Sequence, residues 1–176
     1  LGAHSEGVAE PIFIGRADAI KRLLDDQGAD PARFRIEDTA DEDCALKAVR
    51  LVVAGEADVL MKGLIETRDF LRPVVRRENG LAAGRIMSHV MLFQIPNYHK
   101  LIALSDGGMV PYPTLSEKAA IITNAVAALS AIGCTEPKVA LLCAIEKVNE
   151  KLRETVEAAQ LADMNARGEI SGCAVI

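Results

Sequence analysis

Aromatic residues are the scarcest class in this sequence. They make up 3% of the 176 residues, and tryptophan is absent. Half of the residues are nevertheless hydrophobic, so alanine, valine, leucine and isoleucine must fill the core, as they do in parallel sheets covered by helices. The chain is long enough for one large core or for most of two lobes. The formal net charge of −5 at pH 7 argues against general nucleic-acid binding.

Motifs for metals, covalent nucleophiles and nucleotides are also missing. The cysteines are Cys44, Cys134, Cys143 and Cys173, and the histidines are His4, His89 and His99. They show neither CxxC nor metal-ligand spacing, so no metal site is expected. Ser/His/Asp and Cys/His arrangements, GxGxxG and Walker A motifs are absent too. The cysteine usage predicts a reducing compartment, the cytoplasm, and we expect neither a signal peptide nor a membrane-spanning apolar run.

Strand and helix patterns alternate along the chain, which predicts an α/β fold. Strands are expected at residues 11–15, 34–37, 58–61, 89–95, 100–105 and 138–145 and in the last residues, and helices at 17–27, 43–54, 68–78, 115–132 and 151–167. Thr114 and Glu117 have capping-box spacing, and Thr67 is expected to cap the helix at 68–78. Pro73 is expected near the start of that helix, where its missing N–H costs little. A hairpin at residues 97–99 makes the expected sheet mixed.

A short polar loop follows the expected strand at residues 58–61. In it, Gly63 lets the backbone approach a ligand, and Thr67 offers a hydroxyl at the positive end of a helix. Arg72 can hold two phosphate oxygens with its planar fork. Residues 61–100 carry seven basic and three acidic side chains, which suits a small anion. The loop therefore predicts a phosphate or acyl phosphate site, with a helix cap plus a surface arginine as the alternative.

Two further loops follow expected strands. Asp106 precedes two glycines and can bind a ligand or anchor its own loop by hydrogen bonds. Glu146 can serve as a base or as a loop anchor, and Asn149 can cap the following helix. Because no nucleophile is evident, the sequence favours chemistry by positioning and charge, with the nucleophile supplied by a substrate.

Four stretches of the sequence resemble one enzyme family. They are LMKGLIETRDFLRPVV (residues 60–75), GLAAGRIMSHVMLFQIPNYHKLIALSDGGM (80–109), EKAAIITNAV (117–126) and EPKVALLCAIEKVNEKLRETVEAAQLADMNARGEISGC (136–173). The chain resembles the phosphate acetyltransferase/phosphate butyryltransferase family, and most of all its butyryltransferase branch. The resemblance covers nearly the whole chain.

This resemblance implies a reversible reaction of acyl-CoA with phosphate, giving acyl phosphate and CoA. It implies a two-lobed, mixed-sheet α/β fold similar to the isocitrate/isopropylmalate dehydrogenase type. It also implies a homodimer or higher homo-oligomer, no metal, and coenzyme A as a substrate and not a cofactor. The expected catalytic residues are Thr67 and Arg72, from the family's TxxxxRP segment. The expected substrate-binding residues are Lys62, Gly63, Ser88, Asp106, Glu146 and Asn149.

The sequence departs from the family pattern in two places. Val110 stands where family members usually have an asparagine, which puts contacts from that loop in doubt. The family's C-terminal portion, with a Ser-Arg pair for phosphate and an Asp thought to take the CoA thiol proton, has no counterpart in this sequence. The chain also begins without Met and ends in the apolar run 172–176. We therefore expect residues 1–176 to be part of a phosphate acyltransferase domain and to be inactive alone.

Three alternatives to a free-standing transferase stay open at this point. Similar domains are fused to malic enzymes, where they are thought to sense acyl-CoA without turning it over. A fusion with an enoyl-CoA hydratase domain would leave the transferase activity in place. A dehydrogenase of similar fold is disfavoured, because no metal-binding carboxylate cluster is visible.

Overall fold

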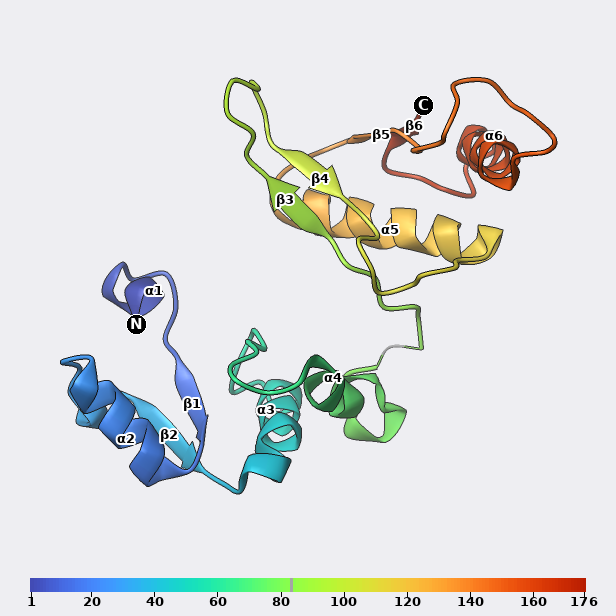
Figure 1. Ribbon diagram of the computed structural model, residues 1–176. Coiled ribbons are helices and arrows are strands. Elements are labelled where there is room, and N and C mark those ends of the chain that lie inside the picture. The colour runs from blue at the N-terminus through green and yellow to red at the C-terminus, as the bar shows by residue number, and fades with distance from the viewer. Residues whose placement is uncertain (83) are drawn as a thin grey trace. The chain divides into compact units, whose positions relative to one another are not determined.

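The chain folds into two compact units, Leu1–Gly84 and Arg85–Ile176 (Figure 1). The computed structural model describes residues 1–82 and 84–176. Each unit has its own helices, strands and buried side chains, so each is described separately.

The N-terminal unit is built on a pair of parallel strands. Its elements are α1 (Gly2–Ser5), β1 (Ile12–Gly15), α2 (Ala17–Asp26), β2 (Arg35–Asp38), α3 (Cys44–Val53) and α4 (Thr67–Val75), with short 3-10 helices at Pro31–Arg33, Asp41–Asp43 and Arg77–Asn79. β1 and β2 pair in register from Ile12 opposite Arg35, and α2 lies alongside them (Figure 1). The strands predicted at 11–15 and 34–37 and the helices predicted at 17–27 and 43–54 are confirmed.

A side-chain hydrogen bond at the start of α2 and the buried side chains of α3 stabilise this unit. The Asp38 carboxylate accepts a hydrogen bond from the Ala17 N–H at 2.8 Å, which satisfies one of the free amides at the start of α2. Helix α3 buries Ala45, Val49 and Leu51. This apolar face explains why α3 forms despite two valines at its end, since packing outweighs weak helix propensity.

The strand predicted at residues 58–61 is wrong. The segment between α3 and α4 is irregular, and the side chains of Val59 and Met61 are 75% and 86% exposed. Among the described residues β1 pairs only with β2, so no strand is available to hydrogen-bond with residues 58–61. An apolar run forms a strand only where a neighbour completes its backbone hydrogen bonds.

Helix α4 differs from the prediction at both ends. Glu66 is the N-cap residue and Thr67 is the first helical residue, so Thr67 is not the cap. The helix ends at Val75 and not at residue 78, and a 3-10 turn follows at Arg77–Asn79. Pro73 is the seventh residue of nine and is buried, so it does not occupy the first turn. Its missing N–H in the last turn agrees with the early end of the helix.

The C-terminal unit combines two long helices with short strands. Its elements are β3 (Met91–Phe93), β4 (Ile102–Leu104), α5 (Leu115–Ala131), β5 (Lys138–Val139), α6 (Arg153–Ala166) and β6 (Ala174–Val175). β3 and β4 form the predicted antiparallel hairpin, with Met91 opposite Leu104. The predicted capping box is confirmed, because Thr114 and Glu117 exchange their hydrogen bonds at the start of α5.

The mixed strand directions predicted for the chain are present, with β1–β2 and β5–β6 parallel and β3–β4 antiparallel, but the strands lie in separate small sheets. The described residues form three two-stranded sheets, β1–β2, β3–β4 and β5–β6. The strand predicted at 138–145 is limited to Lys138–Val139, and beyond it Leu142 is 83% exposed. The last predicted strand is present as the two residues of β6, which pair in parallel with β5.

The core of the C-terminal unit lies around α5 and α6. Its buried side chains are Ile122, Val126, Leu161 and Ile170. Asn165 holds β6 against α6: its amide donates to the carbonyls of Ile170 and Cys173, and its oxygen accepts from the Val175 N–H. The polar side chain of Asn165 is stable at this position because its amide nitrogen and its oxygen both have hydrogen-bond partners.

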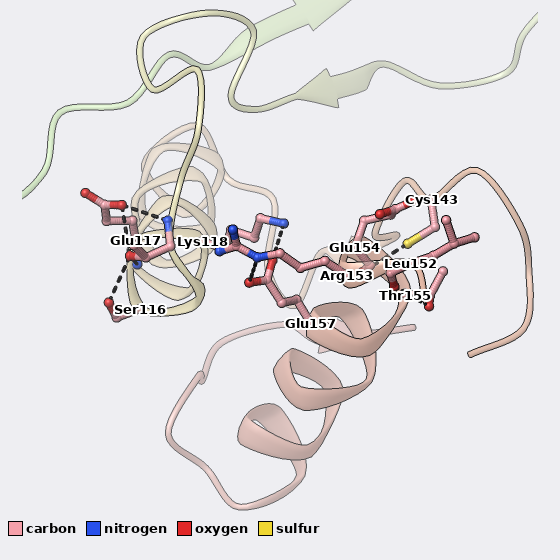
Figure 2. A network of polar contacts seen from close by, with 10 residues as sticks. Ser116, Glu117, Lys118, Cys143, Leu152, Arg153, Glu154, Thr155 and Glu157 are labelled. Atoms are coloured by element: carbon pink, nitrogen blue, oxygen red, sulfur yellow. Dashed lines mark hydrogen bonds and ion pairs between the residues drawn. The ribbon is translucent and has the colours of Figure 1, made fainter. Parts of the chain in front are cut away.

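Glu157 links the two helices of this unit through a buried carboxylate. It is 7% exposed and accepts from Lys118 Nζ and from Arg153 Nε, each at 2.7 Å (Figure 2). Lys118 comes from α5, whereas Arg153 lies one turn before Glu157 on α6. The hydrogen bonds from Lys118 and then from Arg153 lower the pKa of Glu157 below its ordinary value.

Replacing Glu157 should destabilise the folded protein by an amount that depends on pH. A carboxylate whose pKa is lowered by folding stabilises the protein fully above its unfolded pKa of about 4.3, and this contribution is lost as the pH falls through the folded value. We expect Glu157→Gln to have a lower Tm than wild type at pH 7. Below pH 4 we expect this difference in Tm to shrink. Thermal unfolding followed by circular dichroism over pH 3–8 measures both. A Tm difference that is constant over this range would contradict the role given to the charge.

Two further observations concern membranes and metals. Among residues 1–82 and 84–176 no helix is both long and apolar enough to cross a membrane. Within the same residues, no cluster of three or more His, Cys, Asp or Glu side chains is placed to hold a metal ion.

Candidate functional site

The predicted site residues fall equally into the two units. Lys62, Gly63, Thr67 and Arg72 belong to the N-terminal unit, and Ser88, Asp106, Glu146 and Asn149 belong to the C-terminal unit. The convergence of these residues in one site stays a prediction.

The loop before α4 is held by its own backbone and by Lys62. Lys62 Nζ donates to the Ile65 carbonyl at 2.7 Å, and the Ile65 N–H donates to the Gly63 carbonyl at 2.9 Å. A Cβ added to Gly63 would meet no atom within 4 Å, so the protein's own packing does not require glycine there. Open space beside this backbone allows a ligand to approach it closely.

Helix α4 presents Thr67 and Arg72 on different sides. Both residues are exposed. They are five positions apart, and at about 100° per residue this is one full turn plus about 140° around the helix axis. Thr67 lies in the first turn, where free N–H groups favour an anion. Arg68, one turn before Arg72, is on the same side as Arg72. Arg72 therefore projects from a different side of α4 than Thr67 does.

Asp106 organises the loop after β4. Its Oδ1 accepts from the N–H groups of Gly108 and Met109 at 2.8 and 2.9 Å, and Oδ2 accepts from the Val110 N–H at 3.1 Å. Partial burial by itself raises the pKa of Asp106, but hydrogen bonds from the Met109, Gly108 and Val110 amides outweigh it and lower the pKa below its ordinary value. The loop-anchoring alternative for Asp106 is thus present in the structure.

Removing the charge of Asp106 should loosen this loop. We expect Asp106→Asn to speed amide hydrogen exchange at Gly108, Met109 and Val110 by roughly 10-fold, because charge-assisted hydrogen bonds are stronger than neutral ones. Asp163→Asn, at an exposed position on α6, is the matched control. Unchanged exchange at all three amides would contradict the anchoring role.

Ser88 is held by a residue that the sequence analysis missed. Asn124 of α5 donates from Nδ2 to the Ile86 carbonyl at 2.9 Å and to Ser88 Oγ at 3.0 Å. An asparagine inside a long helix is a weak helix former and calls for a partner outside the helix. That signal was available in the EKAAIITNAV stretch. Asn124 thereby fixes the segment that carries Ser88.

Glu146 and Asn149 lie in the irregular segment before α6. Glu146 is exposed. Asn149 does not cap α6, because the N-cap residue is Leu152. Instead Asn149 Oδ1 accepts from the Lys151 N–H at 3.0 Å, and the Asn149 main chain exchanges hydrogen bonds with the Thr155 hydroxyl. Asn149 thus forms an Asx-type turn that positions the loop.

An open surface hollow of about 300 Å³ lies beside Asn124 in the C-terminal unit. It is lined by Arg85, Ile86, Ser116, Glu117, Ala120, Thr123 and Asn124. Side chains with helical spacing on α5 form one wall, and the segment fixed by Asn124 forms the other. Arg85 gives this hollow a cation, and sequence analysis had counted it only among the basic residues of the segment 61–100.

Comparison with known proteins identifies the family. A sequence model described as phosphate acetyl/butaryl transferase matches residues 15–174. The chain belongs to this family. A family relative, the phosphate butyryltransferase of Clostridium acetobutylicum, is 42% identical over 174 residues, which cover 98% of this chain and 58% of the relative. The phosphate acetyltransferase of Thermotoga maritima is 38% identical over 173 residues, 98% of this chain and 59% of the relative.

Solved structures agree with the family fold. A branched-chain phosphotransacylase from Enterococcus faecalis V583 superimposes with a TM-score of 0.76 at 24% identity, covering 96% of this chain and 67% of that one. A phosphotransacetylase from Staphylococcus aureus gives 0.72 at 16% identity, covering 95% and 59%. These likenesses confirm the α/β fold. The chain spans a little under three fifths of the length of the C. acetobutylicum and T. maritima family relatives.

Proposed function

We propose that this chain is part of a phosphate acyltransferase that interconverts a short-chain acyl-CoA plus phosphate with an acyl phosphate plus CoA. The similarity to a phosphate butyryltransferase, 42% over 98% of the chain, carries this proposal. Because relatives of both names match 98% of this chain, butyryl and acetyl groups are the candidate acyl groups. The acyl-CoA sensor alternative has no support among these relatives.

Arg72 and the start of α4 are the groups best suited to the anionic substrate. Arg72 carries a permanent charge and a planar fork that matches two phosphate oxygens. The free N–H groups beside Thr67 add a second source of positive potential. Because Arg72 and Thr67 lie on different sides of α4, Arg72 would hold the phosphate and offset the charge that develops on the transferred acyl oxygen, and the helix start would add to the positive potential around the site.

The acyl group would pass directly between substrates bound at the same time. The CoA thiolate attacks the acyl carbon of acyl phosphate, the carbon–oxygen bond to phosphate breaks, and phosphate leaves; the reverse reaction follows the same path. A thiol is mostly protonated at neutral pH, so a general base must accept its proton. Coenzyme A acts as a substrate here, and the scheme uses no metal.

Other parts of the proposal follow from the family and not from the geometry. They are a two-lobed arrangement of the isocitrate/isopropylmalate dehydrogenase type and a homodimer or higher homo-oligomer. The proposed cytoplasmic location rests on the cysteine usage instead. The similarity to phosphotransacylase structures supports the α/β fold and none of these further features. Residues 1–176 would then form part of one phosphate acyltransferase domain.

Phosphate-dependent release of CoA tests the activity. The protein that carries this chain is mixed with butyryl-CoA or acetyl-CoA, with and without phosphate, and free thiol is followed with a colorimetric reagent. We expect release only with phosphate, and the ratio of the two rates gives the acyl preference. Release that is equal without phosphate would indicate a hydrolase and would overturn the proposal.

A further inference from the structure

The two hydrogen bonds of the Asn124 side chain have a direction that their partners fix. Asn124 Nδ2 lies 2.9 Å from the Ile86 carbonyl oxygen and 3.0 Å from Ser88 Oγ. A carbonyl oxygen can only accept a hydrogen bond, so the atom that faces Ile86 must be the amide nitrogen of Asn124 and not its oxygen. The amide nitrogen in turn can only donate. Ser88 Oγ is therefore the acceptor of the second bond.

This direction leaves the hydrogen of the Ser88 hydroxyl available. A serine hydroxyl has one hydrogen and two lone pairs, and the bond from Asn124 uses one of the lone pairs. In the part of the chain that the structure describes, no protein acceptor takes the Ser88 hydrogen. Ser88 is only partly buried. An acceptor on a bound ligand can therefore take this hydrogen without displacing a protein group.

The segment that carries Ser88 is also held on its other side. Met91 pairs with Leu104 at the open end of the β3–β4 hairpin, so the residues before Met91 approach those that follow Leu104. A Cβ added to Gly107 would lie 3.0 Å from Nδ1 of His89, which places the imidazole ring directly against that glycine. The segment is thus held between α5 and the loop after β4.

We propose that Asn124 is a positioning residue for Ser88, and that its hydrogen bond directs the Ser88 hydroxyl hydrogen to an anionic phosphate oxygen of the phosphate or acyl phosphate substrate. This inference rests on the proposed function and on Ser88 as one of its substrate-binding residues. Arg85, which is exposed and three residues before Ser88, adds positive charge to the same segment. A charged phosphate oxygen is a strong hydrogen-bond acceptor.

The bond from Asn124 improves Ser88 as a donor in two ways. A hydroxyl that accepts one hydrogen bond is polarised and donates the next one more strongly. Its hydrogen is also excluded from the lone-pair direction that Asn124 occupies, so less freedom is lost when the substrate binds. Asn124 therefore acts on the substrate through Ser88 and does not need to touch it.

A double-mutant cycle on the protein that carries this chain tests this role. The rate of CoA release gives kcat/KM for phosphate and KM for butyryl-CoA in wild type, Ser88→Ala, Asn124→Leu and the double variant. We expect Ser88→Ala to lower kcat/KM for phosphate by roughly 10-fold or more, and Asn124→Leu to lower it by about 2- to 10-fold. The double variant should be no worse than Ser88→Ala, because Asn124 then has no hydroxyl to position. KM for butyryl-CoA should stay unchanged in all of them.

A second variant reverses the hydrogen bond while keeping the shape of the side chain. In Asn124→Asp the carboxylate can only accept, so the Ser88 hydrogen turns toward it and away from the substrate. We expect a loss of kcat/KM for phosphate at least as large as in Asn124→Leu. Gln160→Leu, at an exposed position on α6, is the matched control and should leave the kinetics unchanged. Thermal unfolding of each variant shows that it is folded.

The outcomes separate this inference from the function on which it rests. If Asn124→Leu lowers kcat/KM for phosphate by the same factor with and without Ser88, Asn124 has only a structural role and the inference is overturned. A change confined to KM for butyryl-CoA would also overturn it, since the acceptor would then belong to CoA and not to phosphate. A wild type that shows no phosphate-dependent CoA release would reject the proposed function itself.

Discussion

Arg72→Ala should lower kcat/KM for phosphate by roughly 10- to 150-fold, the loss expected when a charged hydrogen-bonding partner of a bound anion is removed. The guanidinium would hold the phosphate in the ground state and offset charge in the transition state. We therefore expect a higher KM for phosphate together with a lower kcat. Steady-state kinetics of CoA release at varied phosphate concentrations measure both constants.

Arg68 provides the control for this prediction within the same helix. It is exposed, like Arg72, and has the same charge one turn earlier on α4. Arg68→Ala should change kcat/KM far less, because general positive charge on α4 is not what the proposal requires. Arg72→Lys keeps the charge but loses the planar fork, so it should recover only part of the activity. Equal effects of Arg68→Ala and Arg72→Ala would reduce Arg72 to one charge among several.

Leu161→Ala should be the most destabilising single change in the C-terminal unit. Leu161 is 2% exposed and lies in the core cluster with Ile122, Val126 and Ile170. Truncating a buried leucine leaves a cavity and costs about 2–5 kcal/mol of unfolding free energy, which corresponds to a fall in Tm of roughly 10 °C or more. Denaturant and thermal unfolding give both quantities.

Leu142→Ala is the matched control for this change. Leu142 has the same side chain and lies in the same unit, but it is 83% exposed. Its truncation should change the unfolding free energy by about 0.5 kcal/mol or less. Similar losses for the two variants would mean that Leu161 does not lie in the core described above.

Helices were predicted from the sequence more successfully than strands, because their signals are local. The capping box of Thr114 and Glu117 and the apolar spacing that follows define α5 without reference to any other segment. Strands depend on partners that are far away in sequence. The apolar runs at residues 58–61 and 138–145 were therefore read as full strands, although the first has none and the second only Lys138–Val139.

The sequence indicated which residues could form the candidate site, but it did not predict their local geometry. The residue types near Arg72 indicated anion binding, but the N-cap position belongs to Glu66 and not to Thr67. Asp106 could be a ligand or a loop anchor from its sequence context, and only coordinates reveal its three backbone hydrogen bonds. Asn124 escaped notice because its partners are 36 and 38 residues away in sequence.

The most direct test of the proposed reaction is identification of its product. The protein that carries this chain is incubated with butyryl-CoA and phosphate, and the mixture is followed by phosphorus NMR together with thiol titration. The account predicts a new acyl phosphate signal that grows in equal amount with free CoA and that reverts when excess CoA is added. Free CoA accompanied by butyrate, with no acyl phosphate at any time, would contradict it.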